Sequence, residues 1–287
     1  MVRSRGQAYA DLYAHRKLAD GFPDLEKQGA EFFSHSQPVV AEFVDNFLPA
    51  VNRLIDLDAF GRKVLVVGTG PKPVTVKRFR ERGYDAVAIE PIAAYVEKGR
   101  ELLGDPDAMR QGACESLPVP DASQGLVLLQ AVLEHVDSPN LSLREIHRVL
   151  RPGGVAYITT TNRWKFSPRG VNDEFTTPFF NWFPPLLRES YVFFQLHYEP
   201  KLANFTPRPA VHWFSYTDLC RIGRREGFAQ FYSPLDLVPD DDPRLSATRI
   251  RRLLKPILLG ARYRPWLRAL LLSQLGGAIF MLKRPSG

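Results

Sequence analysis

The chain has 287 residues, of which 45% are hydrophobic and 24% charged, enough to bury a full α/β core. Its two cysteines, Cys114 and Cys220, lie far apart without metal-like spacing, so the sequence supports neither a disulfide framework nor a zinc site, and a reducing compartment fits best. The N-terminus has no apolar signal segment, and the longest apolar run, 269–282, is interrupted by Ser273 and Gln274 and is too short to cross a bilayer. We therefore expect a cytoplasmic protein, either soluble or peripheral to a membrane.

Basic residues are concentrated near the C-terminus. The formal net charge is +7, and the residues after Asp242 include ten basic and no acidic side chains. Nucleic acid is the usual partner of a basic protein, but these arginines alternate with Leu, Ile and Trp and lack a recognition motif, so we expect no nucleic acid partner. Segment 244–268, in which Pro256 and Pro265 should break any continuous helix, has two interpretations: short helices packed on the core, or a surface that contacts an anionic membrane.

The first part of the chain, 1–62, is predicted to be helical. Its clearest apolar face has helical spacing and comprises Val40, Phe43, Val44, Phe47, Leu48 and Val51. The preceding lead-in carries Tyr9 and Tyr13, which either pack on the core or fold over a ligand.

From residue 63 the pattern alternates between strands and helices, with no internal repeat. Buried strands are predicted at 64–67, 86–90, 125–130 and 155–160, and helices at 74–82, at 92–103 and around 143–150. A polar segment precedes the third of these strands, and "RPGG" reads as a turn before the fourth. This alternation predicts an α/β fold with a parallel, doubly wound sheet.

Segment 163–214 breaks this rhythm. It is rich in aromatic residues and prolines and shows no sustained strand or helix periodicity. It reads as an insertion over the carboxyl edge of the sheet, where open α/β sheets bind ligands, or as a small aromatic subdomain that only supports the core. The remainder, 215–287, reads as a helix capped by Ser215 or Thr217 and stopped by Gly227, then a strand, the basic apolar segment and a last strand, "GAIFMLKR".

A glycine turn follows the first strand of the core. Gly68 and Gly70 let the backbone turn tightly and approach a ligand. The third glycine of a dinucleotide fingerprint is replaced by Pro73, so the turn is not well suited to binding a pyrophosphate. Twenty residues beyond Gly70, Glu90 ends the second strand, where a carboxylate can accept both hydrogen bonds of a ribose diol. Nicotinamide enzymes and adenosyl-binding enzymes both show this pairing.

The downstream string "GACESLPVPDASQGLVLLQAVLEHVDSPNLSLREIHRVLRPGGVAYITT" resembles the class I S-adenosylmethionine-dependent methyltransferases. The resemblance covers residues 63–162 and, more loosely, 213–284. It implies a seven-stranded, mostly parallel, Rossmann-like sheet with an antiparallel last strand, and S-adenosylmethionine as the cofactor. The expected organisation is a helical region at 1–62, a cofactor-binding core at 63–162, an aromatic acceptor-binding insertion at 163–214 and a C-terminal completion of the core at 215–287.

The resemblance also assigns cofactor contacts. The methionine part of the cofactor would lie against Gly68, Thr69 and Gly70, and the ribose would be held by Glu90. The adenine would be edged by Ala113 and Cys114, and the wall near the sulfonium would be formed by Gln130 and Ala131. The family usually carries acids where this chain has Val66, Ala113 and Gly125, and often glycine where it has Lys72. Either backbone groups, water or Glu115 replace the lost contacts, or the fold is retained as a binding or scaffold protein without methyl transfer.

Methyl transfer from a sulfonium mainly requires alignment of donor and acceptor and removal of one proton. His135, after the fourth strand, is the best-placed candidate base, and His212, His197, Asp173 and Glu174 are alternatives; each also has a purely structural interpretation. No residue pattern suggests a metal. The aromatic insertion favours a small-molecule acceptor, and we expect O-methylation of an apolar or ring-containing natural product, lipid or glycolipid in small-molecule biosynthesis, while the oligomeric state stays open.

Overall fold

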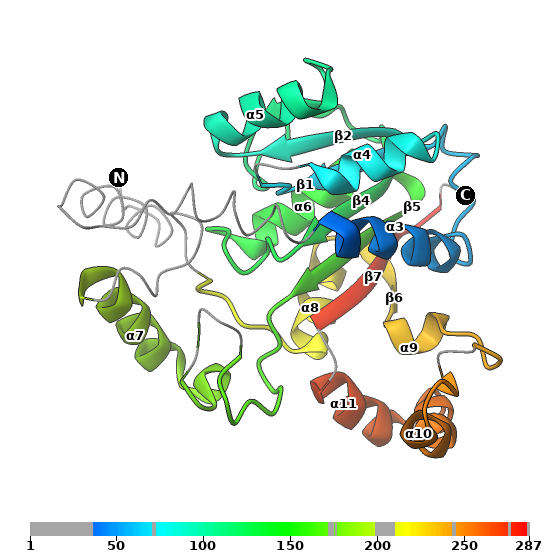
Figure 1. Ribbon diagram of the computed structural model, residues 1–287, viewed down its shortest axis with the longest axis vertical. Helices are drawn as coiled ribbons and strands as arrows, with labels where there is room; N and C mark the ends of the chain where they lie inside the picture. The colour runs from blue at the N-terminus through cyan, green and yellow to red at the C-terminus, as the bar shows by residue number, and fades with distance from the viewer. Residues whose placement is uncertain are drawn as a thin grey trace.

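A single seven-stranded sheet organises the molecule (Figure 1). The computed structural model describes residues 37–70, 73–171, 175, 177–198, 210–242, 245–274 and 277–285. The strand order is β3-β2-β1-β4-β5-β7-β6. The first five strands pair in parallel, and β7 is antiparallel to both β5 and β6, which confirms the expected fold. The strands are β1 (Lys63–Val67), β2 (Asp85–Glu90), β3 (Met109–Gln111), β4 (Gln124–Gln130), β5 (Leu150–Thr160), β6 (Phe228–Tyr232) and β7 (Gly277–Lys283).

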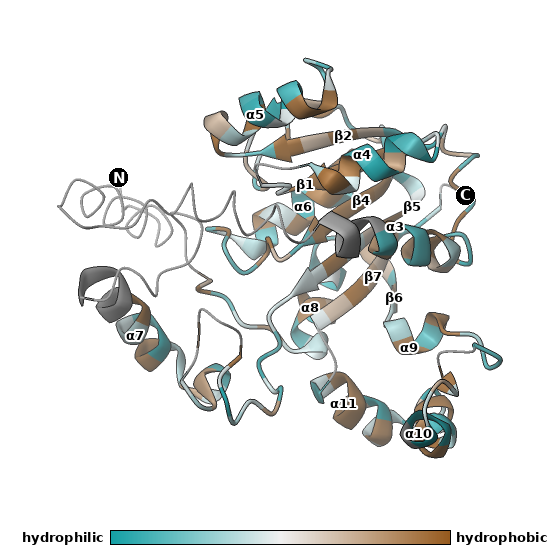
Figure 2. Ribbon diagram, viewed as in Figure 1, coloured by the Kyte–Doolittle hydropathy of each residue, from teal (hydrophilic) through white to brown (hydrophobic). Residues whose placement is uncertain are grey.

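Helices cover both faces of the sheet, so successive strand residues enter different cores. In β1, Val64 and Val66 join the core beneath α3 and α4, whereas Leu65 and Val67 join the core beneath α6 and α8. Figure 2 shows the resulting hydrophobic strands between helices of mixed character. The helices of these layers are α3 (Gln37–Val51), α4 (Val74–Glu81), α5 (Ala93–Leu103), α6 (Pro139–Val149), α8 (Tyr216–Arg225) and α9 (Pro234–Leu237).

The N-terminal prediction holds for the described part of that region. On α3 the buried side chains are Val44, Phe47, Leu48 and Val51, which belong to the predicted face. Tyr9 and Tyr13 lie outside the described residues. Ser215 is the N-cap of α8, where it forms a reciprocal capping box with Asp218, and Gly227 follows the helix with a positive φ of 100°.

The "RPGG" string is not a turn that precedes a strand. Strand β5 begins at Leu150, which pairs with Gln124, and the next pair is Val155 with Leu126, so residues 151–154 form a bulge inside the strand. Opposite this bulge, a Cβ on Gly125 would lie 2.5 Å from the Cβ of Phe60. Position 125 therefore requires glycine for packing, and it lies at the start of β4, at the end of the strand remote from Gln130.

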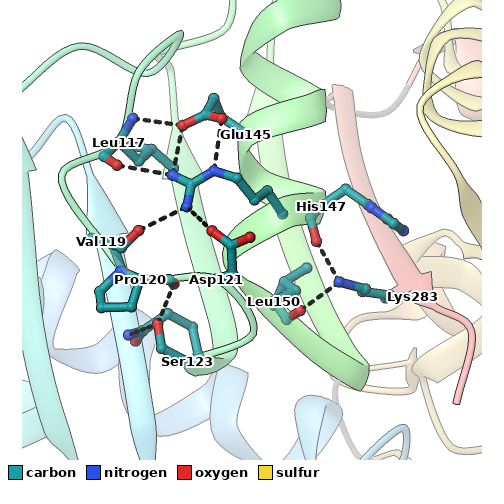
Figure 3. Close-up of polar contacts among 11 residues, drawn as sticks. Leu117, Val119, Pro120, Asp121, Ser123, Glu145, His147, Leu150 and Lys283 are labelled. Atoms are coloured by element: carbon teal, nitrogen blue, oxygen red, sulfur yellow. Dashed lines mark hydrogen bonds and ion pairs between the residues drawn. The ribbon is translucent and has the colours of Figure 1, made fainter. Parts of the chain in front are cut away.

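A network of hydrogen bonds around Arg148 connects the strings "LPVPDAS" and "REIHRVL" (Figure 3). The Arg148 guanidinium donates to both carboxylate oxygens of Glu145, at 2.8 and 2.7 Å, and to Asp121 at 2.6 Å. It also donates to the carbonyl oxygens of Leu117 and Val119, both at 2.9 Å. Because one side chain ties α6 to the whole loop between β3 and β4, these family strings are structural and determine where the loop lies.

The aromatic insertion contains more regular structure than its sequence predicts. A 3-10 turn, η1 (Phe180–Trp182), precedes a helix, α7 (Pro185–Tyr198), although the sequence shows no sustained helical periodicity there. The apolar spacing of α7 is weak because the helix packs on a small separate core rather than on the sheet. That core contains Phe175, Phe180, Val192, Ala210 and Trp213. In Figure 1, α7 lies on the side of the sheet to which β2 points.

The basic segment forms two helices at the bottom of Figure 1, α10 (Arg249–Gly260) and α11 (Pro265–Gln274). Pro265 begins α11, but Pro256 lies within α10, so the prediction that it breaks the helix is wrong. Pro256 is exposed, and the carbonyl that it leaves without a partner in the preceding turn can bind water. Among the described residues, no helix is both long and apolar enough to span a membrane.

Candidate cofactor and acceptor site

The glycine turn is shaped by contact with the loop after β4. Gly68 has a φ of +71°, and its amide donates to the Ile89 carbonyl at 2.8 Å. A Cβ on Gly68 would lie 2.4 Å from Cγ2 of Val132, so no larger residue fits there without displacing that side chain. Gly70 also has a positive φ, of 62°. The turn therefore brings bare backbone to the carboxyl edge of the sheet, beside the end of β4.

Glu90 is the buried acid of this edge. Its side chain is only 4% exposed, and its carboxylate accepts from the amide of Gly70 at 3.0 Å and from that of Ile92 at 3.3 Å. Burial raises the pKa of Glu90 to about 6, while the two amide donors act in the opposite direction. Two amides do not saturate the lone pairs of a carboxylate, so Glu90 can still accept hydroxyl donors from a ligand.

The loop after β3 reaches the same edge. The amide of Gly112 donates to the Glu90 carbonyl at 3.2 Å, which places half-buried Ala113 next to the acid. The Cys114 side chain points into the core beneath α6, and burial raises the pKa of its thiol to about 12. Only the backbone of Cys114 can face an adenine. The Glu115 carboxylate accepts from the amides of Asp137 and Ser138 at 2.7 and 3.3 Å, both through Oε1, so it too can still accept a hydrogen bond.

The end of β4 forms the opposite wall. Gln130 is the last residue of the strand, and Ala131 follows with a φ of +53°, which is unusual for a residue other than glycine. The amide of Ala131 donates to the Thr159 carbonyl at 3.0 Å, which holds this conformation in place. The predicted contacts at Gly68, Gly70, Glu90, Ala113 and Gln130 thus share one sheet edge.

A buried carboxyl that sequence reasoning missed lies beyond this wall. Glu134 is 5% exposed and accepts a hydrogen bond from Thr160 Oγ1 at 2.7 Å. Burial raises its pKa, whereas the charge of His135 and the Thr160 hydroxyl act in the opposite direction. An acid directly after a buried strand, in the string "VLEHV", was the available signal.

The same segment brings together two of the candidate bases. The Glu134 carbonyl accepts from the amides of Val211 and His212 at 2.9 and 3.1 Å, and His212 Nε2 lies 2.9 Å from the Val136 carbonyl oxygen. His135 is half-buried in the turn between these contacts. The other candidates, Asp173 and Glu174, lie outside the described residues, as do Lys72 and the side chain of His197.

This edge fits part of an adenosyl cofactor. A buried carboxylate with free acceptor capacity suits the ribose diol, and the open glycine turn suits the methionine chain. Val66 is buried in the hydrophobic core and Ala113 has no acceptor, so neither supplies the acid usual for the family. Among the described residues, backbone groups of the turn and of the loop after β3, together with Glu115, can bind the amino group and the adenine. Within the described residues, no group of three or more metal-binding side chains is present.

Comparisons with known proteins agree with this geometry. A family model described as a methyltransferase domain matches residues 65–158. A probable S-adenosylmethionine-dependent methyltransferase of Mycolicibacterium smegmatis is 45% identical over 60 residues, which cover 21% of this chain and 23% of that protein. An uncharacterized methyltransferase of Mycobacterium sp. strain JLS is 37% identical over 106 residues, or 35% of this chain and 39% of the relative. The matched segments thus span less than half the length of these relatives.

A solved S-adenosylmethionine-dependent methyltransferase from Mesorhizobium loti is 16% identical, with a TM-score of 0.48 and coverage of 77% of this chain and 90% of that one. The sheet and its carboxyl-edge site define a Rossmann-like α/β protein with a methyltransferase domain. Residues 65–158 match a methyltransferase domain, and the relatives that this part of the chain resembles include a probable S-adenosylmethionine-dependent methyltransferase.

Proposed function

We propose that this protein methylates an oxygen atom of an apolar or ring-containing small molecule. The observation that carries the proposal is buried Glu90, joined to the glycine turn through the amide of Gly70. Calorimetry with S-adenosylhomocysteine, the demethylated product, tests it most directly. Micromolar binding that is lost in Glu90→Ala would support the proposal, and no measurable heat with the wild-type chain would overturn it.

S-adenosylmethionine supplies an activated methyl group when bound. The protein's own part is to hold the ribose through Glu90, to align the acceptor beyond Ala131 and to remove the acceptor proton. His135 and His212 are the proposed bases. The Val136 carbonyl can only accept a hydrogen bond, so Nε2 of His212 carries a proton, and in the neutral ring Nδ1 is then the basic nitrogen. A base is identified by a large loss of turnover with unchanged S-adenosylhomocysteine binding in His135→Gln or His212→Gln.

The insertion is the proposed acceptor-binding part. Some of its rings fill its own core, but Phe166, Phe179 and Trp182 form an outer cluster, with ring centroids 5.4 Å apart for Phe166–Phe179 and 4.9 Å for Phe179–Trp182. Trp182→Ala should impair acceptor use and preserve cofactor binding, because aromatic faces bind apolar rings and sugars. Leu102→Ala, which shortens an exposed apolar side chain on α5, is the control.

A second candidate is a binding or scaffold protein that retains the fold without methyl transfer. The observation in its favour is that Val66 and Ala113 stand where the family usually carries acids, and each lost charge-assisted hydrogen bond is worth about 1.5–3 kcal/mol. Cofactor binding without methyl transfer to any acceptor in a panel of phenols, quinols and glycolipids would favour this candidate.

We further propose that the protein is cytoplasmic and docks peripherally on anionic membranes through α10 and α11. The side chains of Leu253, Tyr263, Trp266 and Leu270 are 76%, 82%, 66% and 55% exposed. Residues 249–274 contain no acid, and exposed basic residues alternate with these apolar ones along the chain. Figure 2 shows hydrophilic and hydrophobic residues together on α10 and α11.

Inward ion pairs orient this surface. Arg262 pairs with Asp240 at 2.5 Å and Arg268 with Asp236 at 2.6 Å, while Arg249, Arg252 and Arg264 make no ion pair within the described part of the chain. A cleft of about 410 Å³ opens beside it, lined on one side by Trp164 and Tyr216 and on the other by Pro265, Ala269 and Leu272 of α11. Such a cleft suits an acceptor that is itself delivered from a lipid surface.

A further inference from the structure

Arg188 of α7 is a buried cation, and two of its guanidinium nitrogens have no hydrogen-bond acceptor among the described residues. Its side chain is only 6% exposed, and both Nε and Nη1 lack an acceptor within the described residues. The guanidinium carbon lies over the aromatic face of Trp213, 5.6 Å from the ring centroid. Burying an arginine in this way is costly, and native structures normally satisfy such donors or use them.

A second arginine faces the same region. Nε of Arg163 is also buried without an acceptor among the described residues, and its guanidinium carbon lies 4.9 Å from the Trp164 ring centroid. Burial and the like charge of Arg163 lower the pKa of Arg188 to about 10, while Glu189 acts in the opposite direction. Asp218, whose pKa Arg163 lowers, is already used by Ser215 and Arg221. The two guanidinium groups therefore repel each other, and neither forms an ion pair with an acid that the structure describes.

The loop that carries Arg163 is held rigidly. Asn181 is fully buried, and its Nδ2 donates to the carbonyls of Arg163 at 2.9 Å and Lys165 at 2.7 Å. Ser167 donates to Oδ1 of the same side chain. On the other side, the amide of Arg163 donates to the Phe214 carbonyl at 2.8 Å, next to Trp213. The arginines are thus preorganised rather than left at a solvated surface.

This pair lies near the candidate bases. Trp213 follows His212, whose amide bonds to the Glu134 carbonyl at the carboxyl end of β4. Arg163 follows the end of β5, three residues after Thr160, which bonds to the Glu134 carboxyl group. The side of the molecule that would present an acceptor to the methyl donor therefore also holds two arginines whose buried N–H groups have no acceptor in the part of the chain that the structure describes.

We infer that Arg188 and Arg163 form a binding site for an anionic oxygen group of the acceptor, a carboxylate or a phosphate carried on a ring or apolar body. This inference rests on the proposed function and specifies the acceptor. A planar guanidinium matches both groups with paired N–H donors, and an anion between the two arginines would satisfy the orphan donors and remove their repulsion. The surrounding aromatic residues would contact the apolar body.

The test uses the full chain with three probes that share one ring: benzoate, phenyl phosphate and benzyl alcohol as the neutral match. Thermal melting and calorimetry are run on the wild type, Arg188→Met, Arg188→Lys and the exposed control Arg249→Gln. One or both anions should raise the wild-type melting temperature, and benzyl alcohol should not. Arg188→Met should bind them at least about tenfold more weakly, Arg188→Lys should fall between, and Arg249→Gln should match the wild type.

Arg188→Met also separates a ligand-binding role from a structural one. Because methionine removes an unpaired buried charge, the variant should melt no lower than the wild type in anion-free buffer. A large drop in its melting temperature, equal shifts with benzoate and benzyl alcohol, or anion shifts that persist in Arg188→Met would each overturn the inference. S-adenosylhomocysteine binding, measured on the same samples, reports separately on the proposed function, since its loss leaves the anion measurements readable. The relative response to benzoate and phenyl phosphate distinguishes carboxylate from phosphate.

Discussion

Cofactor affinity should fall in acid because of Glu90. The ribose hydroxyls would donate to its carboxylate, so the ionised form binds and the protonated form binds poorly. Burial raises the pKa of Glu90 to about 6 from an ordinary 4.5, so the ligand-free protein takes up this proton as the pH falls through 6. At pH 5 about one molecule in eleven would carry the ionised form, and affinity for S-adenosylhomocysteine should be about tenfold weaker than at pH 7.

The raised pKa of Glu90 also predicts that this group destabilises the ligand-free fold at high pH, whereas a carboxylate with a lowered pKa stabilises it there. Above pH 6 the group is ionised in both the folded and the unfolded state, and burial of the charge costs the folded state free energy. Below pH 4.5 the group is protonated in both states, and this cost disappears. The difference of about 1.5 pH units corresponds to about 2 kcal/mol. Ligand-free Glu90→Gln should therefore be up to about 2 kcal/mol more stable than the wild type at pH 8 and similar to it at pH 4.5.

Calorimetric titrations between pH 5 and 7.5 provide the assay, with urea denaturation for stability. Glu90→Gln should bind S-adenosylhomocysteine about ten- to a hundredfold more weakly at pH 7.5 and show little pH dependence below it. Glu97→Gln, an exposed acid on α5, is the control and should behave as the wild type. A wild-type affinity that stays constant from pH 7 to pH 5, or a pH dependence retained in Glu90→Gln, would refute the role assigned to this carboxyl group.

Three further predictions follow from packing, the Arg148 network and the basic helices. Gly68→Ala should weaken S-adenosylhomocysteine binding more than tenfold in calorimetry, because the new Cβ would collide with Val132. Gly104 also has a positive φ, but a Cβ there meets no atom within 4 Å, so Gly104→Ala is the control and should bind as the wild type does. Equal binding by the two variants would contradict the role of the Val132 contact. Arg148→Met removes five hydrogen bonds and should lower the free energy of unfolding, measured by urea denaturation, by roughly 2–4 kcal/mol. A decrease of less than about 0.5 kcal/mol would show that other contacts hold the loop between β3 and β4. Co-sedimentation with phosphatidylserine vesicles should decrease with added salt and in the Arg251→Glu, Arg252→Glu double variant. The control Lys77→Glu, on α4, should co-sediment as the wild type does. Equal binding to neutral vesicles, or no binding at all, would show that α10 and α11 have only a packing role.

Local sequence determined most of the cofactor half of the molecule. The alternation of buried strands and helices is a local pattern, and a tight turn that needs Gly68, with an acid at the end of the next strand, is a local backbone requirement. These features predicted the sheet, its antiparallel last strand through the family resemblance, and the edge where Glu90 lies. Strand β3 was not located from the sequence, because its three residues, "MRQ", are too few to show a strand periodicity.

The acceptor half was decided by contacts between distant residues. Helix α7 packs on its own small core, so its sequence lacks the strong apolar face that a sheet-covering helix shows. Glu134 and Thr160, on different strands, meet only because parallel strands end at one edge. Nothing in the local sequence distinguishes Arg163 and Arg188 from surface arginines, and only the folded insertion buries Arg188 and Nε of Arg163. Burial and the proximity of like charges depend on the tertiary structure, so no local sequence pattern predicts them.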